Sequence, residues 1–479
     1  MARAIDRFMK GRYDARAVIL MLFFVSICRM ILEVSSLPQI TTMNCYARFL
    51  VYINFYLVMF FSFTLLLRMV ANLPFEKAAN PVAVGLLFGV APPLIDYFIG
   101  TEQPRYQYFR EFEPLLTADY LPVGESVVLW ILIVTAGVFS YYLTRSIWRA
   151  AAGGLGAYVI IQLHGFALEW LICSGDAFAL RPHVRSVVLS EVNLLVSFVI
   201  YAIFRGRPIL ASIMRFNHAL PHFMLALAGA AWAGYGFGNG AVKGVIVLSF
   251  FVFLLIQNDY YDQHEDRLAD RHESTTLDDV AWSSFFIFCL LFPLAQVNFL
   301  MVLLFVICLL TGFLYHHPSV RLKERFCLSY KAEGIWALMA FLVGVSSQSG
   351  FSGNDLLAAS ILVFGGGTLI SIPKDWKDLE SDRLARIQTY YVVLTNHGRD
   401  EYVIHRRIVV CVTLGLLVPP ILFFIWRGFS ALGLALLVSS LAPAWALLNL
   451  KDRKKAVETM LWLLSGYLFV LTLFLKSNI

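Results

Sequence analysis

The sequence predicts an all-α protein, a polytopic bundle of transmembrane helices. Hydrophobic residues make up 59% of the 479 residues and charged residues only 15%, whereas charged residues form about a quarter of an average soluble domain. Apolar runs of roughly 17–25 residues recur along the chain, the length that a helix needs to cross about 30 Å of hydrocarbon. The alternation typical of barrel strands is absent, which argues against a β-barrel.

Fifteen apolar runs are long enough to be membrane spans. Six precede a basic segment, Arg205 to Arg215, at about 17–34, 48–67, 80–99, 124–144, 152–173 and 186–204. Nine follow it, at about 217–237, 241–258, 279–296, 298–315, 331–347, 354–372, 407–425, 429–448 and 456–475. The basic segment is the predicted domain boundary, which divides an N-terminal transmembrane module (1–204) from a second domain (205–479).

The distribution of charge sets the expected orientation. With the N-terminus inside, roughly 29 of the 38 Lys and Arg residues fall on the inner side of the predicted layout and about 8 on the outer side, as cytoplasmic loops require. The net charge of +6 therefore indicates cytoplasmic loops and anionic lipid rather than nucleic acid. The seven cysteines are scattered singly, with no pair spaced for zinc or redox chemistry.

An acidic pattern occurs twice in the second domain. The segments that begin at Asp259 and Asp375 share the pattern D-x-x-D-x-x-x-D-R-L-A, and each copy follows a long apolar run at its cytoplasmic end. Two helical units of similar design therefore present similar acidic ends to the same compartment.

The spacing within each copy favours a divalent metal. In a helix, Asn258, Asp262 and Asp266 project from one face, since residues four apart are neighbours. Like charges at this spacing repel one another, so a cation should lie between them. Carboxylate and amide oxygens suit Mg2+ completed by water and phosphate. The predicted ligands are Asn258, Asp259, Asp262, Asp266, Asp375, Asp378 and Asp382.

These motifs resemble those of the UbiA superfamily of intramembrane prenyltransferases. Residues 258–266 match the family's first motif, N-D-x-x-D-x-x-x-D, and residues 374–389 resemble the second. Residues 314–323 resemble the family's tyrosine-proline-arginine-leucine-lysine loop. The resemblance covers about 205–479 and implies the family's nine-helix fold, here preceded by about six extra helices. The chain departs from the family pattern at Ser381, Arg386 and Tyr390-Tyr391.

The resemblance implies a Mg2+-dependent transfer of an isoprenyl or polyprenyl chain from an allylic diphosphate to a lipid-soluble or amphipathic acceptor, of the aromatic quinone-precursor type. Its implied catalytic residues are Asp262, Asp266, Asp378 and Asp382. The implied contacts to the diphosphate are Arg215, Tyr315, Arg321, Lys323 and Lys374. The expected location is the bacterial inner (plasma) membrane, with the site open to the cytoplasm and lipids as neighbours.

Other functions remain open at this stage. A terpene cyclase or a phosphoribosyl transferase on the same fold would keep the diphosphate site and change the cavity. A cation transporter is a more distant alternative, because transport favours acidic groups near the bilayer midplane rather than at the ends of spans. The first six spans carry no recognisable site, and we expect a structural or assembly role for them.

The predicted topology can be tested with cysteine tags at positions 264, 323, 380 and 453, in a background without the native cysteines. All four positions lie in basic loops, so an impermeant thiol reagent should label them from the cytoplasmic side only. Labelling of any of the four from outside would overturn the layout.

Overall fold

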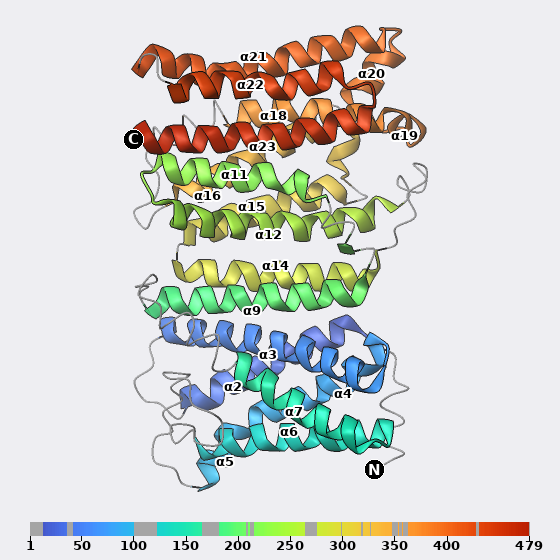
Figure 1. Ribbon diagram of the computed structural model, residues 1–479, viewed down its shortest axis with the longest axis vertical. Helices are drawn as coiled ribbons and strands as arrows, with labels where there is room; N and C mark the ends of the chain where they lie inside the picture. Colours follow the sequence, from blue (N-terminus) through green and yellow to red (C-terminus); the bar gives the residue numbers. More distant parts are fainter. Residues whose placement is uncertain are drawn as a thin grey trace. The chain divides into compact units, whose positions relative to one another are not determined.

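In the computed structural model, all regular secondary structure of the described residues is helical (Figure 1). The described residues are 13–35, 42–99, 122–164, 182–206, 209–210, 215–263, 275–297, 299–317, 320–325, 327–346, 353, 357, 363–427 and 431–478. No β-strand occurs among them. The predicted all-α, polytopic fold is confirmed.

Most predicted spans overlap described helices, whereas the end of span 152–173 and most of the first half of span 354–372 lie outside the described residues. Among the described residues, nine helices are long and apolar enough to cross a membrane. The helices of the first half are α2 (Ala15–Ser35), α3 (Thr42–Ala71), α4 (Phe75–Gly85), η1 (Leu86–Val90), α5 (Ala91–Ile99), α6 (Val123–Thr144), α7 (Ile147–Gln162) and α9 (Pro182–Arg205). Those of the second half are α11 (Phe216–Trp232), α12 (Phe237–Tyr261), α14 (Leu277–Val297), α15 (Phe299–His316), η4 (Leu322–Glu324), α16 (Leu328–Val345), α18 (Gly365–Ser371), η6 (Ile372–Asp378), α19 (Leu379–Leu384), α20 (Tyr390–Asn396), α21 (Glu401–Arg427), α22 (Ala431–Asn449) and α23 (Arg453–Asn478).

The chain divides into two compact units. Unit one consists of residues 1–206 and 284–297, and unit two of residues 207–283 and 298–479. Most of α14 therefore packs with unit one, although the sequence assigns this helix to the second domain. The domain boundary between residues 204 and 205, and the independence of the first module, stay predictions.

In unit one, α3 is the central helix and packs against α2, α4, α7 and α9 (Figure 1). Buried polar groups connect these helices. The Ser62 hydroxyl lies 3.2 Å from Nε2 of His164, and Asn54 donates to the Ser190 hydroxyl. In lipid, such groups require partners within the protein. These two contacts therefore join polar residues across helix interfaces, which is consistent with a structural role.

A buried arginine forms polar contacts between helical segments of unit one. The Arg29 side chain is 3% exposed and lies 3.5 Å from the Glu125 carboxylate. It donates to the backbone carbonyl of Gly89 at 3.1 Å, and Tyr56 donates to the same carbonyl. Gly89 lies in the 3₁₀ segment η1 that interrupts the helical run 75–99. The arginine thus satisfies backbone that the interruption frees.

In unit two, α11 packs against α12, α16 and α23 (Figure 1). The backbones of α11 and α16 touch where two glycines meet. A β-carbon on Gly229 would overlap the carbonyl of Phe341, and one on Gly344 would overlap the carbonyl of Ala226. Close crossings of this kind are common between membrane helices, because small residues allow dense backbone packing. The pair α11 and α16 forms a rigid wall.

A buried lysine caps the end of that wall. Lys243 of α12 donates to the carbonyl oxygens of Gly344 and Ser346, at 2.8 and 2.7 Å. These carbonyls belong to the last turn and C-cap of α16, where a cation complements the helix dipole. Its ammonium also lies 4.2 Å from the centroid of the Tyr235 ring. The lysine therefore joins α12 to α16 at the end opposite the acidic motifs.

The attachment of α14 to unit one can be tested at Phe286. This side chain is fully buried and packs against Phe61, Phe198 and Tyr201 at ring separations of 5.6–6.0 Å. Phe286→Ala should destabilise the protein by about 3 kcal/mol because it leaves a cavity among these rings. Thermal unfolding in detergent measures the loss. Phe313→Ala, at an exposed site on α15, is the matched control, and an equal effect of the two substitutions would contradict the assignment.

Candidate functional site

The two acidic motifs face one cavity inside unit two. The cavity measures about 630 Å³. Asn258 and Asp262 reach it from the end of α12, and Asp375, Asp378 and Asp382 reach it from η6 and α19. Residues more than 110 positions apart along the chain are therefore brought to one end of the same cavity.

The first motif lies where α12 ends. The helix stops at Tyr261, and Asp262 is its C-cap, with φ −91° and ψ 6°. Asn258, one turn earlier, projects to the same side, as the spacing predicts. Asp259 does not line the cavity. It is buried and forms an ion pair with Arg215. Asp266 lies outside the described residues.

The second motif is built on a 3₁₀ helix. Asp375 and Asp378 both lie in η6, which spans Ile372–Asp378. Side chains three apart eclipse in a 3₁₀ helix, so these two carboxylates share one side. Asp382 follows one α-helical turn after Asp378, in α19. The three carboxylates are thus aligned toward the cavity by two short helices of different pitch.

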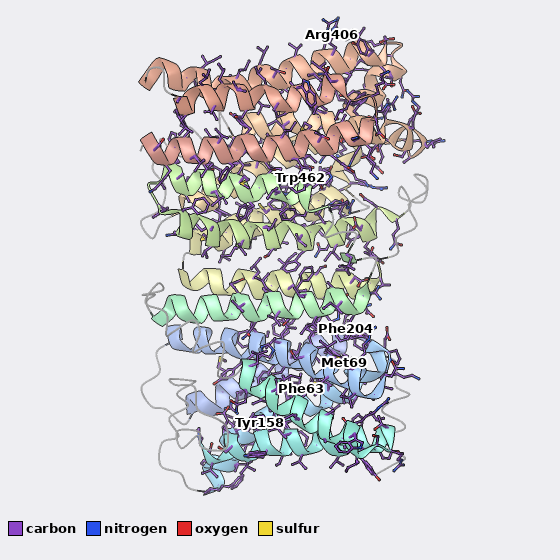
Figure 2. The ribbon with its side chains drawn as sticks, viewed as in Figure 1. Phe63, Met69, Tyr158, Phe204, Arg406 and Trp462 are labelled. Carbon is purple, nitrogen blue, oxygen red and sulfur yellow. The ribbon has the colours of Figure 1, made fainter. Side chains whose placement is uncertain are left out.

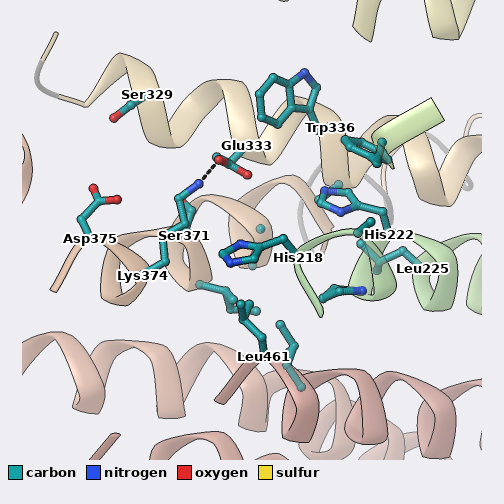
Figure 3. Close-up of a pocket in the computed structure, with 18 of the residues that line it drawn as sticks. His218, His222, Leu225, Ser329, Glu333, Trp336, Ser371, Lys374, Asp375 and Leu461 are labelled. Carbon is teal, nitrogen blue, oxygen red and sulfur yellow. Dashed lines mark hydrogen bonds and ion pairs between the residues drawn. The ribbon is translucent and has the colours of Figure 1, made fainter. Parts of the chain in front are cut away.

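Basic side chains pair with these acids. Lys323 Nζ lies 2.5 Å from Asp262 Oδ1, and Lys377 Nζ lies 4.0 Å from Asp378 Oδ2. Lys374 forms an ion pair with Glu333 of α16, which the close-up shows as a dashed line (Figure 3). In an apolar surrounding a charge needs a partner to remain ionised. The acidic end of the cavity is therefore an ionic network.

Two of the acids are poorly solvated. Burial raises the pKa of Asp375 to about 7. Burial also raises the pKa of Asp382 to about 8, and the neighbouring Asp375 and Asp378 carboxylates add to this shift. Both groups lie beyond the predicted span 354–372. Neighbouring carboxylates that are poorly solvated are difficult to ionise. A cation bound between them would favour their ionised forms.

Most of the remaining cavity wall is apolar and aromatic. Its wall includes Phe251, Leu254, Trp336, Phe341, Tyr467, Leu468 and Leu471. Tyr315 packs against Trp336 with ring centroids 5.3 Å apart, and Phe251 meets Trp336 edge-on at 6.2 Å. The cavity thus accepts a molecule with an ionic head and a long apolar body.

This layout agrees with the comparison to known proteins. The model of the UbiA prenyltransferase family matches residues 222–466, just over half of the chain. The chain belongs to the UbiA prenyltransferase family. The match includes both acidic motifs and most of the cavity wall. As a member of this family with many apolar helices, the protein is an integral, multi-pass membrane protein.

Solved structures of a UbiA homologue from Archaeoglobus fulgidus are similar to part of the chain. The homologue bound to Cd2+ and a second structure of it each have 14% identity and a TM-score of 0.40. The homologue bound to DMAPP and Mg2+ has 16% identity and a TM-score of 0.39. Each match covers 56% of this chain and 99% of the homologue. No curated protein sequence matches the chain.

The donor set of this UbiA protein suits a hard divalent cation. The oxygens of one amide and four carboxylates line the same end of the cavity, and oxygen ligands of this kind are those that Mg2+ takes. Among the described residues, no three acidic, His or Cys side chains are already arranged around a common ion position. Lys323 lies beside Asp262 instead. Metal binding would therefore require this lysine to move away from the carboxylate.

The basic residues predicted for the diphosphate lie in different places. Arg215, Lys323 and Lys374 line the cavity, as does Tyr315. Arg321 does not line it. Its backbone has a left-handed conformation with φ 41°, and its side chain lies 2.7 Å from Glu324. Lys323 is therefore the basic residue of the 314–323 loop that reaches the acids.

The polar cavity residues that the sequence prediction missed include His218, His222 and Glu333 (Figure 3). His218 and His222 are four residues apart on α11, so they share a face. Glu333 lies within the predicted span 331–347, and an ionisable group inside a span is itself a signal of function. That signal was available in the sequence.

A network on the outer side of η6 holds the second motif. Trp376 is not among the cavity residues. Its indole donates to the Glu401 carboxylate at 2.9 Å, and its ring stacks on His405 with centroids 3.6 Å apart. Arg453 of α23 also bonds Glu401, at 2.7 Å. Trp376 thus ties η6 to α21 and α23 while its neighbour Asp375 faces the cavity.

The substitution Trp376→Phe tests this anchor. It keeps a ring to stack on His405 and removes one hydrogen bond to a carboxylate, which is worth about 1.5–3 kcal/mol. We expect a lower Tm in detergent, although the substitution alters none of the carboxylates that line the cavity. Trp445→Phe, at an exposed position on α22, should leave the Tm unchanged. A Tm of Trp376→Phe equal to that of the wild type would show that η6 is held in another way.

Proposed function

We propose that this UbiA protein transfers an isoprenyl or polyprenyl chain from an allylic diphosphate to an acceptor, with Mg2+ as cofactor. One observation carries the proposal, namely that both acidic motifs line the ionic end of a single cavity with an apolar, aromatic remainder. An allylic diphosphate has the same division into an ionic head and an apolar chain. Its head would lie at the carboxylates and its chain along the apolar wall.

The roles of the residues follow from this placement. Asn258, Asp262, Asp375, Asp378 and Asp382 would hold the metal, with Asp266 as a further predicted ligand. When bound, Mg2+ supplies positive charge that stabilises the diphosphate as a leaving group. Lys323 would exchange its contact with Asp262 for one with a diphosphate oxygen. Arg215 keeps its ion pair with Asp259 and borders the same end of the cavity.

The apolar wall protects the reaction. The carbon–oxygen bond of the donor breaks with its electron pair remaining on the diphosphate, and the allylic carbon is left short of electrons. Water would react with this carbon, so the surrounding apolar groups must exclude water from the cavity. Aromatic faces such as those of Phe251 and Trp336 also stabilise nearby positive charge. The acceptor then supplies the electron pair of the new bond to this carbon and releases a proton.

We further propose the setting predicted from the sequence. The acidic end of the cavity would open to the cytoplasmic side of a bacterial inner membrane, where water-soluble Mg2+ reaches the motifs. The basic loops around both motifs support this orientation. The acceptor would be lipid-soluble or amphipathic and of the aromatic quinone-precursor type, and it would enter from the membrane.

The carboxylates provide the direct test. Asp262→Ala and Asp378→Ala should each lower turnover of a radiolabelled isoprenyl diphosphate at least about 100-fold, because an under-coordinated metal stabilises the leaving group poorly. Chelation of Mg2+ should do the same to the wild type. The assay scores both transfer and ionisation to alcohol or hydrocarbon, in purified membranes.

Glu76→Ala, which removes an exposed carboxylate of α4, should retain full turnover. Thermal unfolding should show that both aspartate variants are folded. Metal-independent turnover, or full activity in both aspartate variants, would sink the mechanism. Cyclic hydrocarbon as the sole product would show a cyclase instead.

A further inference from the structure

One helix of the matched family region packs with the N-terminal helices. The UbiA match covers residues 222–466 and so includes all of α14. Residues 284–297 of this helix nevertheless belong to unit one, whereas its first residues belong to unit two. The described residues that line the cavity all belong to unit two. α14 is therefore a continuous connection between unit one and the part of the chain that carries the site.

The middle of α14 is inserted among aromatic side chains of unit one. Phe23 of α2 packs against Phe285 and Phe288, with ring centroids 5.4 and 5.0 Å apart. Phe286 is fully buried and meets rings of α3 and α9. Ring contacts from three helices therefore hold α14 in place. The rings packed around Phe286 are those of Phe61, Phe198 and Tyr201.

The start of α14 is fixed by a reciprocal cap. Thr276 directly precedes Leu277, the first residue of the helix. The Asp279 carboxylate accepts hydrogen bonds from the Thr276 backbone N–H at 2.6 Å and from its hydroxyl at 2.8 Å. The Asp279 N–H donates back to that hydroxyl at 3.4 Å. This arrangement is a capping box with Asp in the place of Glu. It fixes the point at which the chain from the first motif enters α14.

Gln263 joins this cap to the first acidic motif. It directly follows Asp262 in the sequence, and its side-chain amide donates to the backbone carbonyl of Thr275. The same amide lies 3.5 Å from the Thr275 hydroxyl. Thr275 is buried and precedes the cap residue Thr276. Adjacent contacts therefore lead from Asp262 through Gln263 to Thr275 and the first turn of α14.

Asp262 has a use for such a second attachment. It is the C-cap of α12, and its N–H donates to the carbonyl of Asn258 at 2.9 Å. A cap residue is only half inside its helix, so α12 restrains this carboxylate from one side alone. A metal ligand must be held close to its productive geometry by the groups around it. Because α14 is packed in unit one, its position determines where Gln263 holds the backbone after Asp262.

We infer that unit one positions the first acidic motif, with α14 as a rigid connection and Gln263 as the positioning residue beside Asp262. The N-terminal helices then serve the metal site although none of their described residues lines the cavity. The inference rests on the proposed function for one point, the role of Asp262 as a metal ligand. It also implies that residues 205–479 are not an independent module.

Hydrogen exchange tests the connection without metal or donor. Gln263→Ala removes the side-chain bonds to Thr275, so exchange in the segment 256–263, which contains the Asp262 amide, should rise at least about tenfold. Exchange in the segment 372–384, which contains the second motif, should stay unchanged. Gln388→Ala, at an exposed site, should alter neither segment. Wild-type protection of 256–263 in Gln263→Ala would contradict the role of Gln263.

Phe286→Ala acts on the same connection from unit one, and it should also raise exchange in the segment 256–263. The control is Ile161→Ala, a buried substitution on α7 one turn after Tyr158, which Figure 2 labels. Both substitutions remove core volume and lower stability, but only the first lies on α14. An equal rise in both variants would show that exchange follows overall stability, and it would overturn the inference. Phe286→Leu gives the same comparison if Phe286→Ala fails to fold.

Binding of Mn2+, which takes oxygen ligands as Mg2+ does, gives a readout at the metal site. It is measured by electron paramagnetic resonance in nanodiscs without donor. Gln263→Ala and Phe286→Ala should each weaken binding at least about fivefold, while Gln388→Ala and Ile161→Ala should keep the wild-type affinity. The double variant should bind no more weakly than Gln263→Ala, because both changes act along one path. Additive losses would refute the role of Gln263 as the connection.

The two readouts separate this inference from the proposed function. A wild type that binds no Mn2+ and turns over no isoprenyl diphosphate would refute the proposed function, while the exchange pattern would still decide whether unit one positions Asp262. Normal Mg2+-dependent turnover, together with wild-type exchange in Gln263→Ala and Phe286→Ala, would refute only the inference about unit one.

Discussion

The structure of unit two depends on one constraint, the high free energy of an unpaired charge in an apolar bundle. Nine charged side chains line the cavity, namely Arg215, Asp262, Lys323, Glu333, Lys374, Asp375, Lys377, Asp378 and Asp382. The closest pairs join elements that are distant in sequence, such as Lys323 with Asp262 and Lys374 with Glu333. Each such pair is weak as a source of stability but costly to break. The pairs therefore fix which loops and helix ends can meet at the acidic end of the cavity.

The positions of the spans were predictable because hydrophobic length is a strong local signal in lipid. The meeting of the two motifs was also predictable, since both motifs sit at the ends of apolar runs and the structure brings them to one cavity. The conformation of the second motif was not. The predicted span ends at residue 372, and the segment that follows it, Ile372–Asp378, is a short 3₁₀ helix, a form that commonly occurs at the ends of α-helices. The anchor that holds it, Trp376 on Glu401 and His405, joins separate elements and leaves no trace in the local pattern.

The polar residues that α16 contributes to the cavity escaped prediction for a different reason. The two acidic motifs share one pattern, and this repetition made them a specific signal of a functional site. Glu333 and Trp336 occur singly on α16, and single residues in an apolar run have many structural explanations. Their meaning comes from the fold, which places α11 and α16 in backbone contact at Gly229 and Gly344. That contact turns the faces of the two helices toward one cavity.

The same rigid contact explains how one site can separate two incompatible demands. Diphosphate departure requires strong positive charge and therefore several carboxylates to hold it, whereas an electron-poor allylic carbon requires surroundings without water. On α11 and α16 the cavity residues change with depth, from Arg215 and Ser329 near the acidic end to Leu225 and Phe341 further in. Glu333, paired with Lys374, lies between them. If the proposed transfer takes place in this cavity, the two demands would be met at different depths of one site, because a paired charge brings less water into an apolar cavity than a free ion does.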